Sequence, residues 1–236
     1  MTDPVLETVA LDAHYGDFQA LFGIDFSIYE GETVAIVGAN GAGKSTLLKS
    51  ITGLIDNQNA SVVFKGSPIG NWPANRVAKQ GIALVPEGRQ LFQSLSVEEN
   101  LRLGATVKRA GPWNLKTVYE LFPVLNERRK YGATQLSGGQ QQMVAIGRAL
   151  MSNPDVLLFD EISLGLAPVI INSIYEQLAS IIDQGTTIVL IEQDISRALG
   201  AASRVYCLQE GRVKLEGKAS ELNREQITEA YFGVAV

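Results

Sequence analysis

Apolar residues recur along the chain with two different periods, and together these periods predict an α/β fold. Short continuous apolar runs of strand length stand at 33–38, 81–86, 156–159 and 188–191. Such runs are typical of strands that are covered on both faces. Two of the runs are followed by apolar residues at helical spacing. After 33–38 these are Leu47, Leu48, Ile51 and Leu54, and after 156–159 they are Ile171, Ile174, Leu178, Ile181 and Ile182. Strands that alternate with helices predict a mostly parallel sheet with crossover connections.

The two ends of the chain follow a strand pattern of another kind. Segments 5–11 and 22–29 alternate apolar and polar residues, which predicts half-buried antiparallel strands. Segment 61–66 reads as a further strand, and 204–217 reads as a hairpin that turns at Glu210 and Gly211. We therefore expect an N-terminal antiparallel part beside the parallel sheet.

The middle of the chain, 88–152, is mostly helical in pattern and predicts a second lobe inserted into a core of 1–87 and 153–236. Ser96 with Glu99 fits a capping box that opens a helix through about residue 108. Ser137 with Gln140 fits a second one, for a helix to about Met151. Pro168 suits the first turn of the later amphipathic helix.

Composition narrows the function classes. The chain has 236 residues, 46% of them apolar, and a net charge of −5 with a pI of about 5.0. That balance argues against a strongly basic nucleic-acid face. Cys207 and His14 are the sole residues of their types, which excludes an intramolecular disulfide and, in practice, a structural zinc site. We expect Cys207, inside an apolar run, to be a core side chain.

Nothing in the sequence predicts export or membrane insertion. The N-terminus is acidic and lacks the apolar stretch of a signal peptide. No run approaches the roughly 18 apolar residues of a membrane-spanning helix. We therefore expect a soluble chain in a reducing compartment that reaches any membrane through a partner.

A glycine-rich loop at 38–46 carries the clearest chemistry. It matches the phosphate-loop pattern G-x-x-x-x-G-K-[ST] between a predicted strand and a predicted helix. Its backbone N–H groups and the helix dipole favour an anion, Lys44 reaches the β- and γ-phosphates, and the Ser45 hydroxyl suits Mg²⁺. The alternative is a glycine-rich turn with an incidental lysine. The predicted nucleotide-binding residues here are Gly38, Asn40, Gly41, Gly43, Lys44, Ser45 and Thr46.

Two carboxylates end the buried run at 156–159. Asp160 and Glu161 are expected at the carboxyl edge of the sheet, where α/β proteins bind ligands. Asp160 fits a Mg²⁺ ligand, and Glu161 fits the base that polarises the attacking water. The plainer reading is a solvated turn after a strand.

The segment Leu136–Gln140 reads LSGGQ and, with the two preceding motifs, gives the chain a family resemblance. The sequence resembles ATP-binding subunits of ABC transporters along essentially its whole length. Alone, LSGGQ would be only a capped helix start. The resemblance implies that Ser137, Gly138, Gly139 and Gln140 bind the γ-phosphate of ATP held by an opposing subunit, so that two subunits enclose two nucleotides head to tail. It also implies that Tyr15 stacks on adenine, although a packing tyrosine fits the same position.

Further segments narrow the resemblance to importers of branched-chain amino acids and related amides. They are VPEGRQLF at 85–92, LSVEENL, the helix at 140–151, SLGLAP at 163–168, IEQD and AYFG at 230–233. The chain looks like the second of two different ATPase subunits, with no regulatory domain after it. The implied partners are another ATPase subunit or a second copy, two membrane permease subunits and an extracytoplasmic binding protein, at the cytoplasmic face of a bacterial inner membrane. No nucleic-acid partner is implied.

The sequence departs from the family at three places near the predicted γ-phosphate. Gln193 stands where most members have a histidine, within a Glu192–Asp194 segment that we expect to face the phosphate. Glu87 stands where glutamine usually contacts Mg²⁺ and water. A third carboxylate there adds a repulsion of about 3 kcal/mol at roughly 6 Å and an effective dielectric constant of about 20; a solvated loop glutamate is the plain alternative. Segment 163–167 lacks the usual aspartate.

Several readings of the function remain open at this point. The leading one is ATP-driven import of branched-chain or other hydrophobic amino acids. The alternatives are the same mechanism with urea or short-chain amides, a low-activity regulatory subunit, and a soluble ABC ATPase that acts on DNA or ribosomes. Leu91 and Phe92, in the loop 87–94, are predicted to receive a helix of the membrane subunit, but could equally belong to the core of the helical lobe.

Overall fold

The computed structural model describes residues 3–57 and 61–232 and divides into two compact units. One unit comprises Met1–Val77 with Thr187–Val236, and the other Ala78–Thr186. The predicted helical lobe, 88–152, falls within the second unit, and its bounds as a separate subdomain stay a prediction. Gly233 of the AYFG segment lies outside the described residues.

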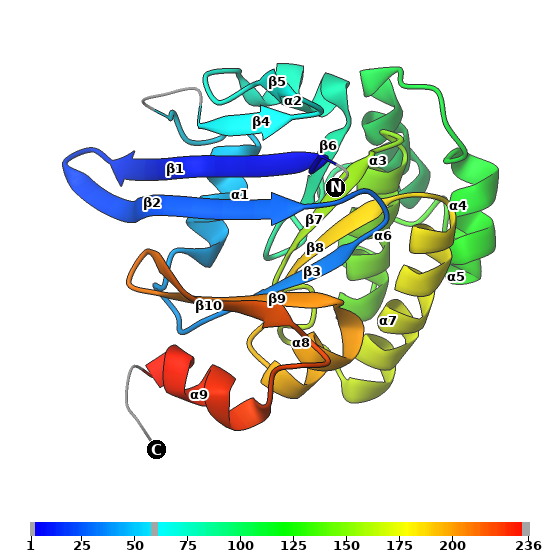
Figure 1. The fold of residues 1–236 in the computed structure, drawn as a ribbon. Helices are drawn as coiled ribbons and strands as arrows, with labels where there is room; N and C mark the ends of the chain where they lie inside the picture. The colour runs from blue at the N-terminus through cyan, green and yellow to red at the C-terminus, as the bar shows by residue number, and fades with distance from the viewer. Residues whose placement is uncertain (1–2, 58–60, 233–236) are drawn as a thin grey trace. The chain divides into compact units, whose positions relative to one another are not determined.

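An antiparallel sheet forms one part of the first unit (Figure 1). Its strand order is β2-β1-β4-β5, with bounds β1 Leu6–Tyr15, β2 Phe18–Ile28, β4 Val62–Phe64 and β5 Ser67–Pro68. Leu6 lies opposite Ile28 on one side and Phe64 on the other, and all three are buried. The two antiparallel strands predicted at the N-terminus are thus confirmed, and both extend beyond the predicted bounds.

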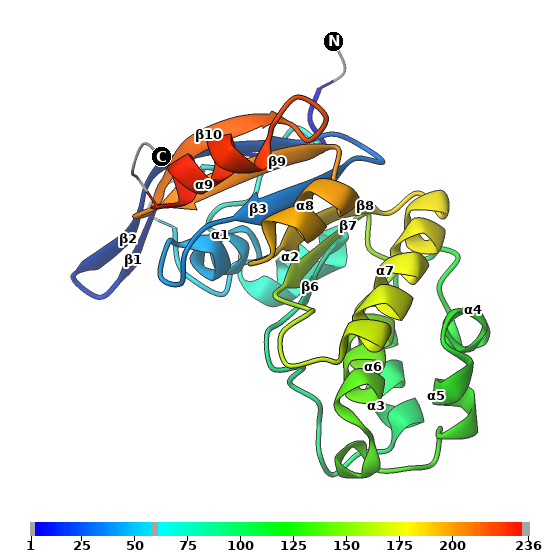
Figure 2. The same cartoon turned by 90° about the horizontal axis from the view of Figure 1, so that it is seen from below.

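The other sheet of this unit places β3 (Thr33–Val37) between two parallel neighbours. These are β8 (Thr187–Ile191) and β9 (Arg204–Gln209), and β9 continues through a hairpin into antiparallel β10 (Arg212–Lys218). Every residue of β3 and β8 is buried, as their continuous apolar runs predicted. Helices α8 (Ile195–Ala201) and α9 (Arg224–Phe232) cover β3 and β9 through a core that includes Ala198 and Ile227 (Figure 2).

Helix α1 (Lys44–Ile51) corrects one predicted helical face. Leu47, Leu48 and Ile51 are buried as expected, but Leu54 lies beyond the helix and is 58% exposed. The helix ends because Gly53 adopts a left-handed conformation, with φ of 68°, which is a common way to terminate a helix. Helix α2 (Ala74–Gln80) follows later in the chain.

The second unit pairs two parallel strands and carries most of the helices. Strands β6 (Ile82–Val85) and β7 (Val156–Asp160) align Val85 with Phe159. β7 is fully buried, whereas the middle residues of β6 are half-buried, so the prediction of a strand covered on both faces was only partly right for β6. The helices are α3 Val97–Gly104, α4 Leu115–Leu121, α5 Pro123–Glu127, α6 Gly138–Leu150 and α7 Pro168–Asp183, with 3₁₀ turns at Ala105–Val107 and Ala133–Gln135.

The predicted helix starts of this unit are confirmed. Ser96 with Glu99 and Ser137 with Gln140 both form reciprocal capping boxes, so each satisfies two backbone N–H groups. Pro168 opens α7, whose buried stripe is Ile171, Ile174, Leu178 and Ile181. Local sequence therefore set where these helices begin.

Cys207 gives a first testable prediction. The side chain is fully buried in β9, and burial raises the pKa of its thiol to about 11. Because a raised pKa leaves almost no thiolate at pH 8 and the sulfur is inaccessible, we expect a thiol reagent to label the protein only as fast as it unfolds. Comparing labelling rates with and without denaturant checks this, and rapid labelling of the native protein would contradict it.

In the part of the chain that the structure describes, no helix is both long and apolar enough to cross a bilayer.

Candidate functional site

The loop between β3 and α1 is shaped around its lysine. Lys44 is only 4% exposed, and its Nζ donates to the carbonyl oxygens of Gly38 at 2.8 Å and Ala39 at 3.0 Å. Gly38 has φ of 152°, and a Cβ there would collide with the carbonyl oxygen of Leu208. The loop therefore holds a preset cation beside backbone N–H groups at a helix start, which is the arrangement that binds phosphate.

Gln193 follows β8, the strand beside β3 in the sheet, and its side chain contacts this loop. β3 and β8 are parallel with Ile36 opposite Ile191, so the segments that follow them leave the same edge. The Nε2 of Gln193 donates to Oδ1 of Asn40 at 3.3 Å, and its side chain is exposed. The amide thus lies against the phosphate loop across a sequence separation of 153 residues.

The residues on either side of Gln193 differ from it in burial or in hydrogen bonding. Glu192 is buried, with 1% of its surface exposed. Asp194 accepts a hydrogen bond from the Arg197 N–H at 3.2 Å and caps α8. The expectation that the whole segment faces the phosphate was therefore wrong for Asp194, because its carboxylate satisfies a helix start.

Tyr15 also lies within reach of the loop. It ends β1, is 48% exposed, and its hydroxyl is 3.4 Å from the Thr46 hydroxyl oxygen. Both groups can donate or accept in this contact. An exposed aromatic ring next to a phosphate loop offers a face on which a nucleotide base can stack.

In the second unit, two carboxylates stand at the end of β7, and a third follows β6. Asp160 is the last residue of β7 and is 3% exposed, and Glu161 follows it with a left-handed φ of 51°. A left-handed conformation at a non-glycine residue costs on the order of 1–3 kcal/mol and is often found at functional sites. Since Val85 pairs with Phe159, the exposed Glu87 leaves the same edge two residues beyond β6.

The LSGGQ segment forms the N-terminus of α6. Ser137 Oγ accepts from the Gln140 N–H at 3.3 Å, and Gln140 Oε1 accepts from the Ser137 N–H at 3.0 Å. These side chains cap the helix, so an incoming anion would meet chiefly the backbone N–H groups of Gly138 and Gly139. Gly139 has no room for a side chain, because a Cβ would lie 2.5 Å from a methyl group of Ile170.

The structure adds an arginine that the sequence reasoning missed. Arg89 Nη1 donates to Gln141 Oε1 at 3.4 Å, and a Cβ on Gly138 would lie 3.1 Å from Arg89 Nη2. The guanidinium therefore rests against the start of α6. In the sequence, within VPEGRQLF, Arg89 is only a basic residue of a predicted loop. Its contact with Gln141 spans 52 positions, so the spacing of residues could not predict it.

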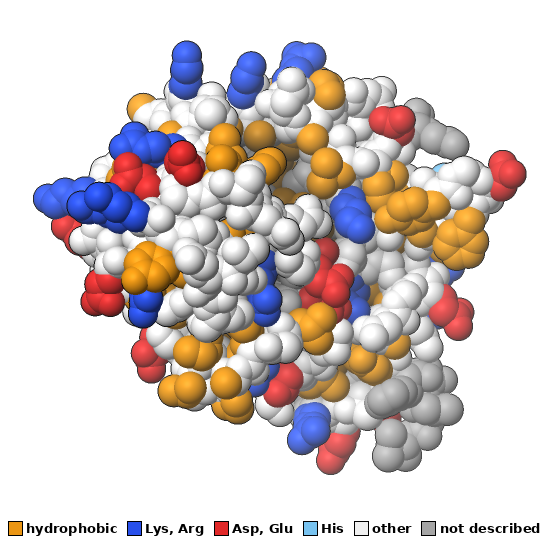
Figure 3. All heavy atoms as spheres, turned by 180° about the vertical axis from the view of Figure 1, so that it is seen from behind, with side chains coloured by type: hydrophobic (Ala, Val, Ile, Leu, Met, Phe, Trp, Pro, Cys, Tyr) orange, Lys and Arg blue, Asp and Glu red, His pale blue; other side chains and the backbone are white. Residues whose placement is uncertain are grey.

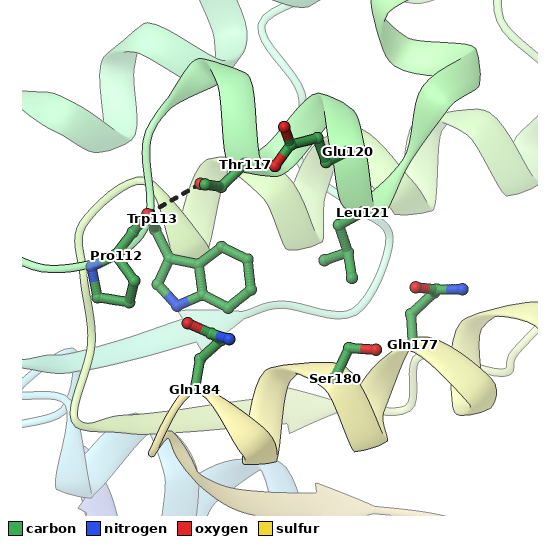
Figure 4. A pocket seen from close by; sticks show the side chains of 8 residues that line it. All are labelled: Pro112, Trp113, Thr117, Glu120, Leu121, Gln177, Ser180 and Gln184. Carbon is green, nitrogen blue, oxygen red and sulfur yellow. Dashed lines mark hydrogen bonds between the residues drawn. The ribbon is translucent and has the colours of Figure 1, made fainter.

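A pocket of about 280 Å³ lies elsewhere in the second unit, between α4 and α7 (Figure 4). Trp113 and Leu121 line one side, and Gln177, Ser180 and Gln184 line the other. No lysine or arginine lines it. It therefore lacks the positive charge that a nucleotide phosphate requires.

Comparison with known proteins agrees with these features. The family model described as "ABC transporter" matches residues 21–163. The chain is 42% identical to the high-affinity branched-chain amino acid transport ATP-binding protein BraG of Pseudomonas aeruginosa, over 94% of this chain and 97% of that protein. It is 38% identical to LivF of Archaeoglobus fulgidus, a probable branched-chain amino acid transport ATP-binding protein, over 92% and 94% of the two chains.

Solved structures show the same fold. The ADP conformation of MJ1267, an ATP-binding cassette of an ABC transporter, superposes with a TM-score of 0.82 at 29% identity, covering 99% of this chain and 100% of that one. A dimeric post-hydrolysis state of the cassette MJ0796, bound to ADP and Pi, gives 0.80 at 27% identity over 91% and 98%. This chain therefore belongs to the ATP-binding cassette proteins of the ABC transporter family.

Proposed function

We propose that this chain is the ATP-hydrolysing subunit of an importer of branched-chain or other hydrophobic amino acids. The observation that carries the proposal is the near full-length similarity to BraG and LivF, whose names state that transport. As an ABC ATPase, the chain hydrolyses ATP and uses Mg²⁺. The phosphate loop with its buried Lys44 supports the nucleotide assignment independently.

ATP is bound, in this proposal, by the first unit. Tyr15 stacks on the base, the N–H groups of the loop 38–46 surround the phosphates, and Lys44 exchanges its contacts with loop carbonyls for β- and γ-phosphate oxygens. Gln193, already against Asn40, donates its amide hydrogens to the γ-phosphate. An amide carries no positive charge, so the site lacks the cation that a histidine could supply there.

The carboxylates of the second unit supply the proton chemistry. Asp160 and the Ser45 hydroxyl would each supply an oxygen ligand for Mg²⁺, and the ion would offset charge on the phosphates. The donor chemistry fits this ion, because a carboxylate and a hydroxyl both offer oxygen ligands and Mg²⁺ usually combines one or two carboxylates with substrate phosphates. Glu161 takes a proton from the attacking water, and Glu87 helps to orient that water or the ion.

The signature segment acts on a second nucleotide. ABC cassettes form dimers, and one neighbour of this fold is dimeric with ADP and Pi bound. We propose that Ser137, Gly138, Gly139 and Gln140 of each subunit close head to tail on the γ-phosphate held by the other. The opposing subunit is a different ATPase or a second copy of this chain.

Membrane subunits complete the proposed transporter. Two permease subunits would span the bacterial inner membrane and bind this chain at the cytoplasmic face of that membrane. An extracytoplasmic protein would deliver the cargo. Phe92 is 54% exposed and Leu91 half-buried, so Phe92 does not belong to the core of the helical lobe and is available to a permease helix. Basic and acidic side chains are interspersed on the face drawn in Figure 3.

The cargo separates this proposal from its nearest alternative, urea or short-chain amides. Calorimetric titration of the proposed extracytoplasmic binding protein would decide between them. We expect leucine, isoleucine or valine to bind and urea and acetamide to fail. Tight binding of urea or acetamide alone would replace the amino-acid proposal while leaving the ATPase role intact.

Gln193→His gives a prediction about the γ-phosphate contact. We expect turnover to rise, and to rise more at pH 6 than at pH 8, because an imidazole is cationic below its pKa of about 6.5 whereas an amide never is. The measurement is steady-state ATP hydrolysis across this pH range. Gln193→Ala serves as control. An unchanged or lower rate for the histidine variant would show that the glutamine does not limit the rate of ATP hydrolysis.

A further inference from the structure

The turn between β9 and β10 is bonded to two other parts of the first unit. Glu210 and Gly211 are consecutive left-handed residues, with φ of 47° and 70°, and Gln209 pairs with Arg212 across them. This is the backbone expected of a two-residue hairpin. The N–H and the carbonyl of Gly211 both form hydrogen bonds outside the β9–β10 ladder, one on each side of the turn.

The N–H of Gly211 bonds the phosphate loop. It donates to the Ala42 carbonyl at 3.0 Å. The packing here is close, because a Cβ on Gly43 would lie 3.4 Å from the Cα of Gly211, and a Cβ on Gly38 would collide with the Leu208 carbonyl oxygen. The end of β9 and its turn therefore contact the phosphate loop at the first and the last of its glycines.

The carbonyl of Gly211 bonds β2, and the orange turn lies beside that blue strand in Figure 1. It accepts from the Phe22 N–H at 2.9 Å. A Cβ on Gly211 would collide with the Ala20 carbonyl oxygen and would lie 2.9 Å from Cδ2 of Phe22. These nearest atoms all belong to β2, so a larger residue at position 211 would displace β2 before it displaced the phosphate loop.

Strand β2 in turn carries the strand that ends in Tyr15. The two strands form a hairpin in which Tyr15 lies opposite Phe18. The ring of Tyr15 is 48% exposed, and its hydroxyl lies 3.4 Å from that of Thr46, at the long end of hydrogen-bonding distance. The two bonds of Gly211 are shorter, so they are the firmer connection between this hairpin and the phosphate loop.

A second hairpin in the same unit shows that the turn conformation does not require such packing. Lys65 and Gly66, between β4 and β5, have φ of 49° and 74°, and Phe64 pairs with Ser67 across them. Within the described part of the chain, a Cβ on Gly66 would meet no atom within 4 Å. The two turns share a backbone and differ in what surrounds the glycine, so the close contacts of Gly211 belong to its bridging position.

We propose that Gly211 is a positioning residue for nucleotide binding: it sets the distance between the aromatic face of Tyr15 and the phosphate loop, so that one nucleotide reaches both. Gly211 acts through the backbones of Ala42 and Phe22. A nucleotide has a limited span between base and phosphates, so a displaced hairpin loses the base while the loop keeps the phosphates. The inference rests on the proposed function, since that function places the base on Tyr15.

Comparing ADP with pyrophosphate measures what the base contributes, because both carry a diphosphate and only ADP adds adenosine. Calorimetric titration of the full chain with each ligand and Mg²⁺ gives the ratio of the Kd for pyrophosphate to the Kd for ADP. In Gly211→Ala we expect ADP to bind about fivefold more weakly or worse, the scale of a lost stacking contact, and pyrophosphate to stay within about twofold of the parent. The ratio should therefore fall.

Tyr15→Ala should lower the same ratio, and the double variant should lie no lower than Tyr15→Ala, because both changes remove one contact. Gly66→Ala is the matched control, since it places the same side chain at the same left-handed φ in open space. Its two affinities should equal those of the parent. Equal losses of ADP and pyrophosphate in Gly211→Ala would mean that Gly211 only supports the phosphate loop, and would overturn the inference.

Hydrogen exchange of the parent gives a second measurement, which stands even if Gly211→Ala does not fold. A ligand that spans the hairpin and the loop should stabilise the bridge between them. Saturating ADP should therefore slow exchange of the Phe22 and Gly211 amides more than saturating pyrophosphate does, and Tyr15→Ala should abolish the difference. Equal protection by the two ligands in the parent would overturn the inference.

The outcomes separate the inference from the function on which it rests. If Tyr15→Ala leaves the ratio at its parent value, the base does not lie on Tyr15, and the proposed nucleotide site and the inference fail together. If Tyr15→Ala lowers the ratio while Gly211→Ala does not, or if the two losses multiply, the base contact stands and the positioning role of Gly211 is overturned.

Discussion

Replacing Glu161 by glutamine is expected to reduce ATP hydrolysis by about 10²–10⁴-fold while ATP still binds. The amide keeps the size and the left-handed position of the side chain, at φ of 51°, but cannot accept a proton from water. The measurement is steady-state phosphate release by the purified chain, beside ATP affinity from titration. Because binding survives and cleavage does not, ATP-bound dimers should accumulate, and light scattering should detect them.

Glu176→Gln is the matched control, because this glutamate is exposed on α7 in the same unit. Its turnover should equal that of the parent. A Glu161→Gln variant that hydrolyses ATP at the parent rate would move the base to another group, and Glu87 would be the first candidate. If the parent itself has no measurable turnover, the low-activity regulatory reading gains support until the partner ATPase is added.

Lys44→Met is expected to weaken ATP binding by about 30-fold or more, since truncating a buried charged partner typically costs 2–5 kcal/mol. The methionine fills similar space but removes the ammonium that the loop carbonyls of Gly38 and Ala39 hold ready. Titration with a fluorescent ATP analogue measures the change, and a thermal melt reports whether the loop still folds.

Lys49→Met, on the same helix α1, tests whether loss of any lysine there has this effect. We expect its ATP affinity to stay within about twofold of the parent, because Lys49 is half-buried in the last turn of the helix, at the end away from the phosphate loop. Equal losses for the two variants would mean that Lys44 supports the fold and does not bind phosphate. Unchanged affinity in Lys44→Met would remove the phosphate-loop assignment.

Much of the fold followed from local sequence. The buried runs at 33–38 and 188–191 became β3 and β8, and the boxes at Ser96 and Ser137 opened helices as predicted. Both signals act within a few residues, where periodicity and capping chemistry are decisive. Leu54 was misplaced because a left-handed Gly53 ended the helix before an apolar pattern that still looked helical.

Sequence motifs predict part of the candidate site, whereas its tertiary contacts follow from no motif. Lys44, Asp160 and the signature glycines stand in motifs whose spacing states their chemistry. The bond from Gln193 to Asn40 spans 153 positions, and the bond from Arg89 to Gln141 spans 52. Hydrophobic periodicity along the chain does not predict such contacts.

ATP-driven uptake of a branched-chain amino acid tests the central claim most directly. Vesicles would hold this chain with its partner ATPase, permease subunits and binding protein, and labelled leucine inside them would be measured with Mg-ATP supplied on the side of the chain. The account predicts accumulation that requires ATP and is lost in Glu161→Gln. Leucine accumulation that persists in that variant would contradict it, as would accumulation of labelled urea or acetamide with none of leucine.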